Sequence, residues 1–199
     1  PRRPWTVLSY AAMSNNLEDS GLEQMNAMEK VGSGPSMHIV RQMSRSRSES
    51  RDDRNWAGSR RFYVTKDGNP DRIVSPILAN LGDIDSGRPQ SLVDFCTWAI
   101  PLFPGDRTWL ALENHGGGPL WGYGSDDAHG THQTLSELGT AVKQAVEALR
   151  RQTGRPGARF DVISLHACMM GTLEVVYELR PYARVILVLV GVLLTSLAL

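Results

Sequence analysis

The segment SLHACMMGTLEV, Ser164 to Val175, places one cysteine between the end of an apolar run and the start of a helical pattern. A thiolate is a strong nucleophile, and Cys168 would become reactive if a base or an imidazolium ion stood next to it. A buried cysteine without such a neighbour is usually an inert core residue. The chemistry of Cys168 therefore depends on whether the fold brings a base to it.

The candidate base is His115, which follows a second strand-like run in TWLALENHGGG, Thr108 to Gly118. If the two runs are neighbouring parallel strands, joined by a helix over Thr134–Gln152, their carboxyl ends share one edge of the sheet. Open α/β sheets bind ligands at that edge. We therefore predict that His115 and Cys168 meet there and form a nucleophile–base pair for acyl transfer.

Acyl transfer also needs hydrogen-bond donors for the oxyanion of its intermediate. The backbone N–H groups of Gly116 and Cys168 are the predicted donors, and a glycine at 116 lets a carbonyl group come close to the backbone. Each feature alone has a plainer interpretation, because glycine runs often form turns and most histidines at strand ends are structural. The prediction depends on both residues standing at the ends of adjacent strands.

A zinc site is the alternative interpretation of the nearby sequence DDAHGTH, which combines two carboxylates with two imidazoles. With His115 or His166 these groups could surround a metal ion. Their spacing in a glycine-containing loop is permissive, and such side chains are usually solvated, so we predict no metal site. The candidate ligands are Asp126, Asp127, His129 and His132.

The stretch Arg41 to Arg61 is rich in arginine and serine and could be an RNA-binding arm. Acidic residues interrupt it, and Trp56 is its one ring for stacking on a base, so we interpret it as a solvated, mobile loop. Lys plus Arg and Asp plus Glu both number 21 in the chain, which gives a formal net charge of zero. The net charge therefore creates no electrostatic field that would attract nucleic acid, and we expect no nucleic-acid partner.

Apolar runs with strand character alternate with helical patterns along the chain. This alternation predicts an α/β fold, a three-layer α/β/α sandwich with a mainly parallel sheet. The sequence TLSE predicts a capping box with Thr134 as the N-cap of its helix. The predicted strands are Trp5–Tyr10, Met37–Met43, Arg61–Thr65, Thr108–Glu113, Phe160–Leu165 and Val185–Val190, and the predicted helices are Asn16–Val31, Ser91–Phe103, Thr134–Gln152 and Gly171–Tyr182.

The remaining segments bear on the cell compartment and on domain organisation. Cys96, on a predicted helix, is assigned to the protein core. The segment Lys66–Pro89 is interpreted as a long surface excursion. Two cysteines are too few for a disulfide framework. The N-terminal residues show no secretory signal, so a cytoplasmic location is the default expectation. We expect one domain over residues 1–184 and an apolar tail over residues 185–199. The tail is short for a membrane span, and its alternatives are a truncated product and a membrane-associated segment.

Several stretches, in order from Trp5 to Ala183, together resemble the clostripain family of cysteine peptidases. They include PWTVLSYAAMSNNLE, WAGSRRFYV, LGDIDSGRPQSLVDFCTWA, NHGGG and HACMMGTLEVVYELRPYA. The resemblance implies a caspase-like fold, a peptide or protein substrate and endopeptidase cleavage after basic residues. It also implies that His115 and Cys168 form the catalytic dyad. No cofactor is expected from the residues, and a calcium requirement is implied by the resemblance alone.

Position 166 departs from the family pattern. The family usually has an aspartate two residues before the nucleophile, where it helps to hold a basic substrate side chain, and this chain has His166. A carboxylate pairs with arginine in a bidentate fork, whereas a neutral imidazole offers one acceptor and an imidazolium ion repels the cation. We assign His166 to substrate binding. A degenerate or truncated relative that keeps the fold as a non-enzymatic module remains the second hypothesis.

Overall fold

A computed structural model describes residues 1–46 and 50–188 of the chain. Its main-sheet strands are β1 (Arg3–Met13), β2 (Met37–Arg45), β3 (Gly58–Tyr63), β4 (Ile77–Gly82), β5 (Gly105–Glu113), β8 (Phe160–His166) and β9 (Ala183–Val188). A separate hairpin consists of β6 (Tyr123–Asp126) and β7 (Thr131–Gln133). The helices are α1 (Glu18–Glu29), the 3₁₀ turn η1 (Asp53–Asn55), α2 (Pro89–Leu102), α3 (Gly118–Trp121), α4 (Leu135–Thr153) and α5 (Leu173–Leu179).

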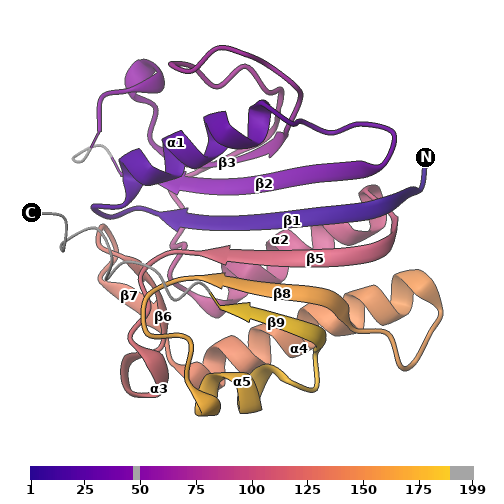
Figure 1. The fold of residues 1–199 in the computed structure, drawn as a ribbon. Helices are drawn as coiled ribbons and strands as arrows, with labels where there is room; N and C mark the ends of the chain where they lie inside the picture. The colour runs from indigo at the N-terminus through magenta and orange to yellow at the C-terminus, as the bar shows by residue number, and fades with distance from the viewer. Residues whose placement is uncertain (47–49, 189–199) are drawn as a thin grey trace, which may run out of the picture.

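The seven strands form one sheet in the order β4-β3-β2-β1-β5-β8-β9. Strands β2, β1, β5, β8 and β9 pair in parallel, and β3 and β4 are added antiparallel at one side. Figure 1 shows α1 on one face of the sheet and α2 and α4 on the other. The predicted three-layer sandwich with a mainly parallel sheet is confirmed.

Two apolar clusters hold the layers together, one on each face of the sheet. The larger one packs α2, α4 and α5 against buried strand residues such as Leu8, Leu110 and Ile163. The smaller one packs Leu22 and Met25 of α1 against the ends of β1 and β2. Cys96 of α2 has no exposed surface, which confirms its assignment to the core, and burial raises the pKa of its thiol to about 12.

The interpretation of residues 41–61 as a solvated loop is wrong at both ends. Arg41 and Arg45 lie on β2 with fully buried side chains, and residues 58–61 belong to β3. Arg41 forms an ion pair with Glu113 of β5, and Arg45 forms one with Glu18 of α1. Buried charges are tolerated where they are paired, and neither partner is near in sequence.

The predicted surface excursion over residues 66–89 contains an unpredicted strand, β4. It lies at the edge of the sheet, and Ile77 and Leu78 on it are exposed. An edge strand outside the core lacks regular apolar alternation, so the apolar periodicity of the sequence did not indicate β4. The hairpin β6-β7 was missed for a similar reason, since its strands are short and lie in a glycine-rich loop.

Helix α4 begins as its sequence predicts. The hydroxyl oxygen of Thr134 accepts the backbone N–H of Glu137, and the Glu137 carboxylate accepts the backbone N–H of Thr134, so both arms of the capping box are present. The last helix differs from its prediction. It starts at Leu173 instead of Gly171, because Thr172 is its N-cap.

The last predicted strand is confirmed as β9, which pairs in parallel with β8. Val185 and Leu187 on β9 are about half exposed, at 50% and 47%. The end of that predicted strand and the unassigned tail, residues 189–199, lie outside the described residues. Within the described ranges, no helix is both long enough and apolar enough to cross a bilayer.

Candidate active site

The pairing of β5 with β8 brings the two candidate catalytic segments together. The strands are parallel neighbours with Glu113 opposite His166, and the backbone N–H of Asn114 donates to the carbonyl of His166 at 3.3 Å. His115 and Cys168 each stand two residues beyond that matched pair. The arrowheads of both strands point to the same end of the sheet in Figure 1. The predicted topology is confirmed, and both residues lie at one edge.

Gly116 lies directly against the backbone of the cysteine loop. A Cβ atom at this position would overlap the carbonyl oxygen of Cys168 and would lie 2.7 Å from the Met170 side chain. Only glycine therefore lets the two loops approach so closely. In the part of the chain that the structure describes, the N–H groups of Gly116 and Cys168 have no hydrogen-bond acceptor, so both are free to donate to a ligand.

The turn that carries Cys168 is exposed and locally strained. The cysteine is solvent-accessible, and Met169 after it has a φ of 57°, a left-handed conformation that costs energy for a residue other than glycine. Because α5 begins only at Leu173, its N-terminal dipole is farther from the thiol than the sequence suggested. The electrostatic effect of that dipole falls off within the first turn, so it contributes less than expected.

Asn16, in the loop after β1, orients the imidazole of His115. Its Oδ1 lies 2.6 Å from His115 Nε2. An amide oxygen only accepts hydrogen bonds, so in the neutral ring this contact favours the tautomer with the proton on Nε2, which leaves the Nδ1 lone pair to take a proton. Sequence reasoning placed Asn16 only at the start of a helical pattern. The available signal was that SNN, residues 14–16, directly follows a strand that is parallel to β5 and adjacent to it.

A hollow of about 400 Å³ opens beside His115. The indole ring of Trp121 forms one wall and stacks on His132, with the ring centroids 4.5 Å apart. The carboxylate of Asp127 is exposed at the hollow and has no hydrogen-bond or ion-pair partner among the described residues. The lining residues are Asn16, His115, Gly116, Gly117, Trp121, Ser125 and Asp127.

His166 lies apart from this hollow, on the sheet surface. Its Nε2 is 3.1 Å from Ser164 Oγ, and that same oxygen accepts a hydrogen bond from the indole of Trp109 at 2.8 Å. The serine hydroxyl can therefore donate its proton to His166 Nε2. The His166 side chain is half-buried and none of its atoms lines the hollow.

A family model described as the clostripain family matches residues 9–190 of the chain. The chain belongs to the clostripain family. Clostripain from Hathewaya histolytica is 26% identical over 208 aligned positions, which cover 88% of this chain and 36% of that protein. The chain thus spans about a third of the length of this curated relative.

Two solved structures share the clostripain-family fold seen here. One is a secreted C11 cysteine protease from Bacteroides thetaiotaomicron in complex with an irreversible peptide inhibitor, with a TM-score of 0.67, 22% identity and coverage of 91% of this chain and 47% of that one. The other is an inactive zymogen C11 protease from Parabacteroides distasonis, with a TM-score of 0.63, 20% identity and coverage of 91% and 46%. At these identities the likeness establishes the fold.

The four candidate zinc ligands of the clostripain-family chain do not converge on one point. Asp126 is buried, and its Oδ2 accepts hydrogen bonds from the backbone N–H and the hydroxyl of Ser86. Asp127 faces the hollow and His132 stacks on Trp121. Within the described residues, the cluster with metal-binding geometry is instead Asp85, Asp126 and His129, whose ligand atoms lie within 4.8 Å of one another.

The pair of His129 with Asp126 gives a testable pH dependence. The Asp126 carboxylate is 3.1 Å from His129 Nδ1, and this hydrogen bond raises the pKa of His129 above its ordinary value of 6.5. A raised pKa in the folded state stabilises the fold below pH 6.5, and that contribution is lost as the pH rises through the folded-state pKa. We expect the difference in free energy of unfolding between the protein and His129→Gln to shrink from pH 5.5 to 8.5. Urea unfolding measures it, and a pH-independent difference would contradict the assignment.

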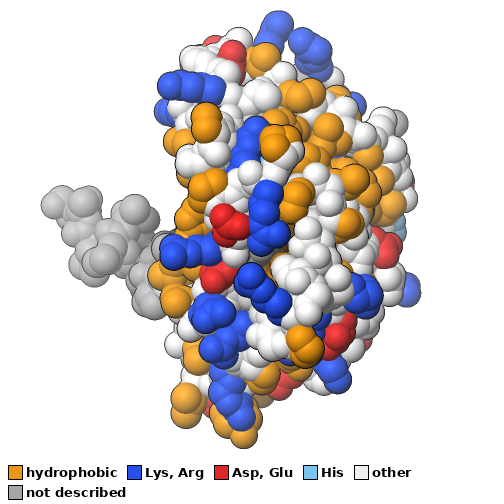
Figure 2. All heavy atoms as spheres, turned by 90° about the vertical axis from the view of Figure 1, so that its right-hand side faces the viewer, with side chains coloured by type: hydrophobic (Ala, Val, Ile, Leu, Met, Phe, Trp, Pro, Cys, Tyr) orange, Lys and Arg blue, Asp and Glu red, His pale blue; other side chains and the backbone are white. Residues whose placement is uncertain are grey.

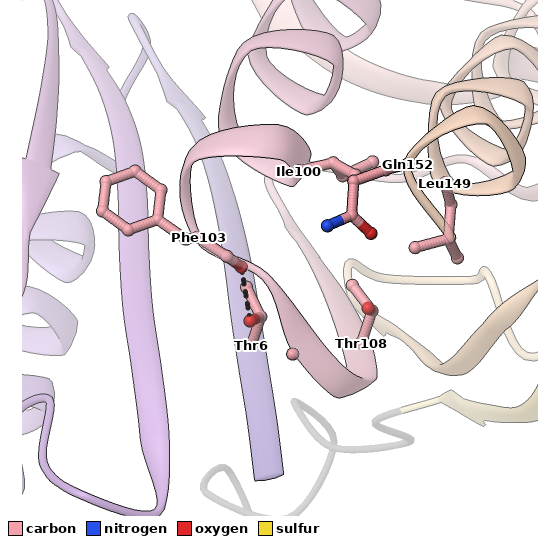
Figure 3. Close-up of a pocket in the computed structure, with 7 residues that line it drawn as sticks. Thr6, Ile100, Phe103, Thr108, Leu149 and Gln152 are labelled. Carbon is pink, nitrogen blue, oxygen red and sulfur yellow. Dashed lines mark hydrogen bonds between the residues drawn. The ribbon is translucent and has the colours of Figure 1, made fainter. Parts of the chain in front are cut away.

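The opposite end of the sheet differs from this edge in the residues that the structure describes. Figure 2 looks onto that end, where Lys and Arg side chains are interspersed with apolar ones. A small gap there has no room for a water molecule, and the hydroxyl of Thr6 beside it donates to the carbonyl of Phe103 at 2.7 Å (Figure 3).

Proposed function

We propose that this chain is the catalytic part of a cysteine endopeptidase, with Cys168 as the nucleophile and His115 as its base. The observation that carries the proposal is the register of β5 and β8, because it sets a histidine and an exposed cysteine at matched positions on one sheet edge. Membership of the clostripain family supports the same reaction class.

The proposed reaction begins when His115 Nδ1 takes the proton from the Cys168 thiol. The sulfur attacks the carbonyl carbon of the scissile peptide bond, and the carbonyl electrons move onto its oxygen. As the carbon–nitrogen bond breaks, the imidazolium gives its proton to the leaving amine, and a thioester to Cys168 remains. Water activated by the same imidazole then hydrolyses the thioester, which releases a carboxylic acid and regenerates the thiol.

The N–H groups of Gly116 and Cys168 are the proposed donors to the oxyanion. Both lack an acceptor among the described residues, and the close contact of Gly116 with the cysteine loop keeps them near each other. Fixed donors of this kind stabilise the charge that develops in the transition state without having to reorganise. Asn16 supports the step by holding the proton of His115 on Nε2.

Cleavage after basic residues is the proposed specificity. Resemblance to the clostripain family supports it, and the exposed carboxylate of Asp127 at the hollow adds local negative charge. His166 lies outside the hollow, but by resemblance it stands where the family usually has an aspartate that holds the basic side chain, and an imidazole pairs with a guanidinium group less well than a carboxylate does. We expect His166→Asp to raise kcat/KM for arginine substrates relative to neutral ones by roughly 10- to 100-fold, the effect of about 1.5–3 kcal/mol from a charge-assisted hydrogen bond.

The test is a panel of fluorogenic peptides with Arg, Lys or a neutral residue before the scissile bond. The panel is assayed with the protein, with His166→Asp and with Cys168→Ala, each shown to be folded by circular dichroism. Cleavage that disappears in Cys168→Ala supports the proposal. A folded protein and a folded His166→Asp variant that cleave none of the peptides would favour a non-enzymatic module, which is the second hypothesis.

A further inference from the structure

Two buried asparagines lie directly beneath His115 and Asn16. Asn15, in the loop after β1, has no exposed surface, and Asn114, at the end of β5, is 3% exposed. Asn15 Nδ2 donates to Asn114 Oδ1 at 3.0 Å, so the two amides are joined across segments that are far apart in the chain. Each precedes a residue of the proposed catalytic machinery.

The two amides hold three chain segments in one arrangement. The NH₂ groups of both donate to the carbonyl of Ser125, at 2.8 Å from Asn15 and 2.9 Å from Asn114. The NH₂ group of Asn114 also donates to the carbonyl of Ala12 near the end of β1, and that of Asn15 lies 3.4 Å from the same oxygen. The loops after β1 and β5 are thereby fixed to β6, which contributes Ser125 to the hollow.

The hydrogen bonds of Asn114 are complete. Its NH₂ group donates to two carbonyls, and its Oδ1 accepts from Asn15 Nδ2 and from the backbone N–H of His115 at 2.5 Å. An asparagine side chain has no further donors or acceptors to offer. A fully satisfied buried network of this kind rigidifies the groups attached to it.

The network fixes both ends of the hydrogen bond between Asn16 and His115. Asn114 holds the backbone of His115, while Asn15 Oδ1 accepts the backbone N–H of Leu17 at 2.9 Å and so fixes the residue after Asn16. Asn16 itself is exposed, and among the described residues its side chain is hydrogen-bonded to His115 alone. The position of its amide oxygen depends on the buried layer.

We propose that Asn15 and Asn114 are positioning residues that keep His115 in the tautomer with its proton on Nε2. The importance of this tautomer for catalysis rests on the proposed peptidase function, whereas the tautomer itself can be measured without any peptidase activity. When the two loops are held, Asn16 Oδ1 accepts from Nε2 and the Nδ1 lone pair is available as the base. When they loosen, the ring can rotate and its proton can occupy either nitrogen.

The test measures the tautomer of His115 directly, by ¹⁵N NMR of the imidazole nitrogens at a pH where the ring is neutral. We expect the Nε2–H tautomer in the protein and a mixture in Asn114→Ala and Asn16→Ala. The matched control is Asn80→Ala, an exposed asparagine on β4 far from the site, which should leave the spectrum unchanged. This readout does not require the protein to cleave a peptide.

The second readout is the rate at which iodoacetamide alkylates Cys168. We expect a decrease of roughly 10- to 100-fold in Asn114→Ala, the effect of a small misplacement of a catalytic group, and no change in Asn80→Ala. If Asn114→Ala does not fold, Asn15→Ser replaces it, because a serine oxygen can still accept the Leu17 N–H. A folded variant with an unchanged tautomer and an unchanged rate would overturn the proposal.

Discussion

Replacement of Glu113 by alanine is expected to destabilise the fold by about 3–5 kcal/mol, because it leaves the buried guanidinium group of Arg41 without a counter-charge. Arg41 Nη1 lies 2.9 Å and 2.8 Å from the two carboxylate oxygens, and the hydroxyl of Ser9 donates to one of them. The side chains of the pair are 0% and 1% exposed. The guanidinium group of the variant would therefore stay buried without a counter-charge.

The matched control for Glu113→Ala is Asp106→Ala, which removes the partner of Arg2 in an ion pair whose side chains are 46% and 64% exposed. Exposed pairs contribute only about 0.2–1 kcal/mol. Urea unfolding of both variants gives the two free energies. The double variant Arg41→Met with Glu113→Leu should recover much of the loss, because an apolar pair needs no counter-charge. Equal, small losses in Glu113→Ala and Asp106→Ala would contradict the assigned role of the buried pair.

The regular strands and helices around the site could be predicted from the sequence. The strands that end before His115 and Cys168 are apolar runs closed by polar residues, and the helix between them has a capping box at Thr134. Period and capping are local properties, so they can be read without knowledge of distant contacts. The shared sheet edge followed from the topology that these elements imply.

The residues that sequence reasoning missed depend on contacts between distant segments. Asn16 and His115 are 99 residues apart, and a single asparagine after a strand has no charge or spacing that marks it as an orienting group. Arg41 and Arg45 stand in a serine- and arginine-rich segment of the kind that is usually solvated. Their burial follows only from Glu113 and Glu18, which the sheet and α1 bring to them.

The second large effect concerns the thiol. His115→Ala removes the proposed base of Cys168, and a positioned general base contributes about 10²–10⁴-fold to reaction rates. The reactivity of Cys168 towards an electrophile at neutral pH should fall within that range, while the fold should remain intact because the imidazole is on the surface of the hollow. His132→Ala is the matched control, since that imidazole is also near the hollow but stacks on Trp121.

The most direct test of the proposed dyad is therefore the alkylation rate of each cysteine by iodoacetamide, resolved by mass spectrometry in the protein, in His115→Ala and in His132→Ala. Cys96 has no exposed surface and serves as the internal reference for folding. We expect rapid labelling of Cys168, slow labelling of Cys96, and a loss of at least about 10²-fold at Cys168 in His115→Ala alone. Equal rates at Cys168 in all three proteins would show that His115 does not activate the thiol and would contradict the proposed dyad.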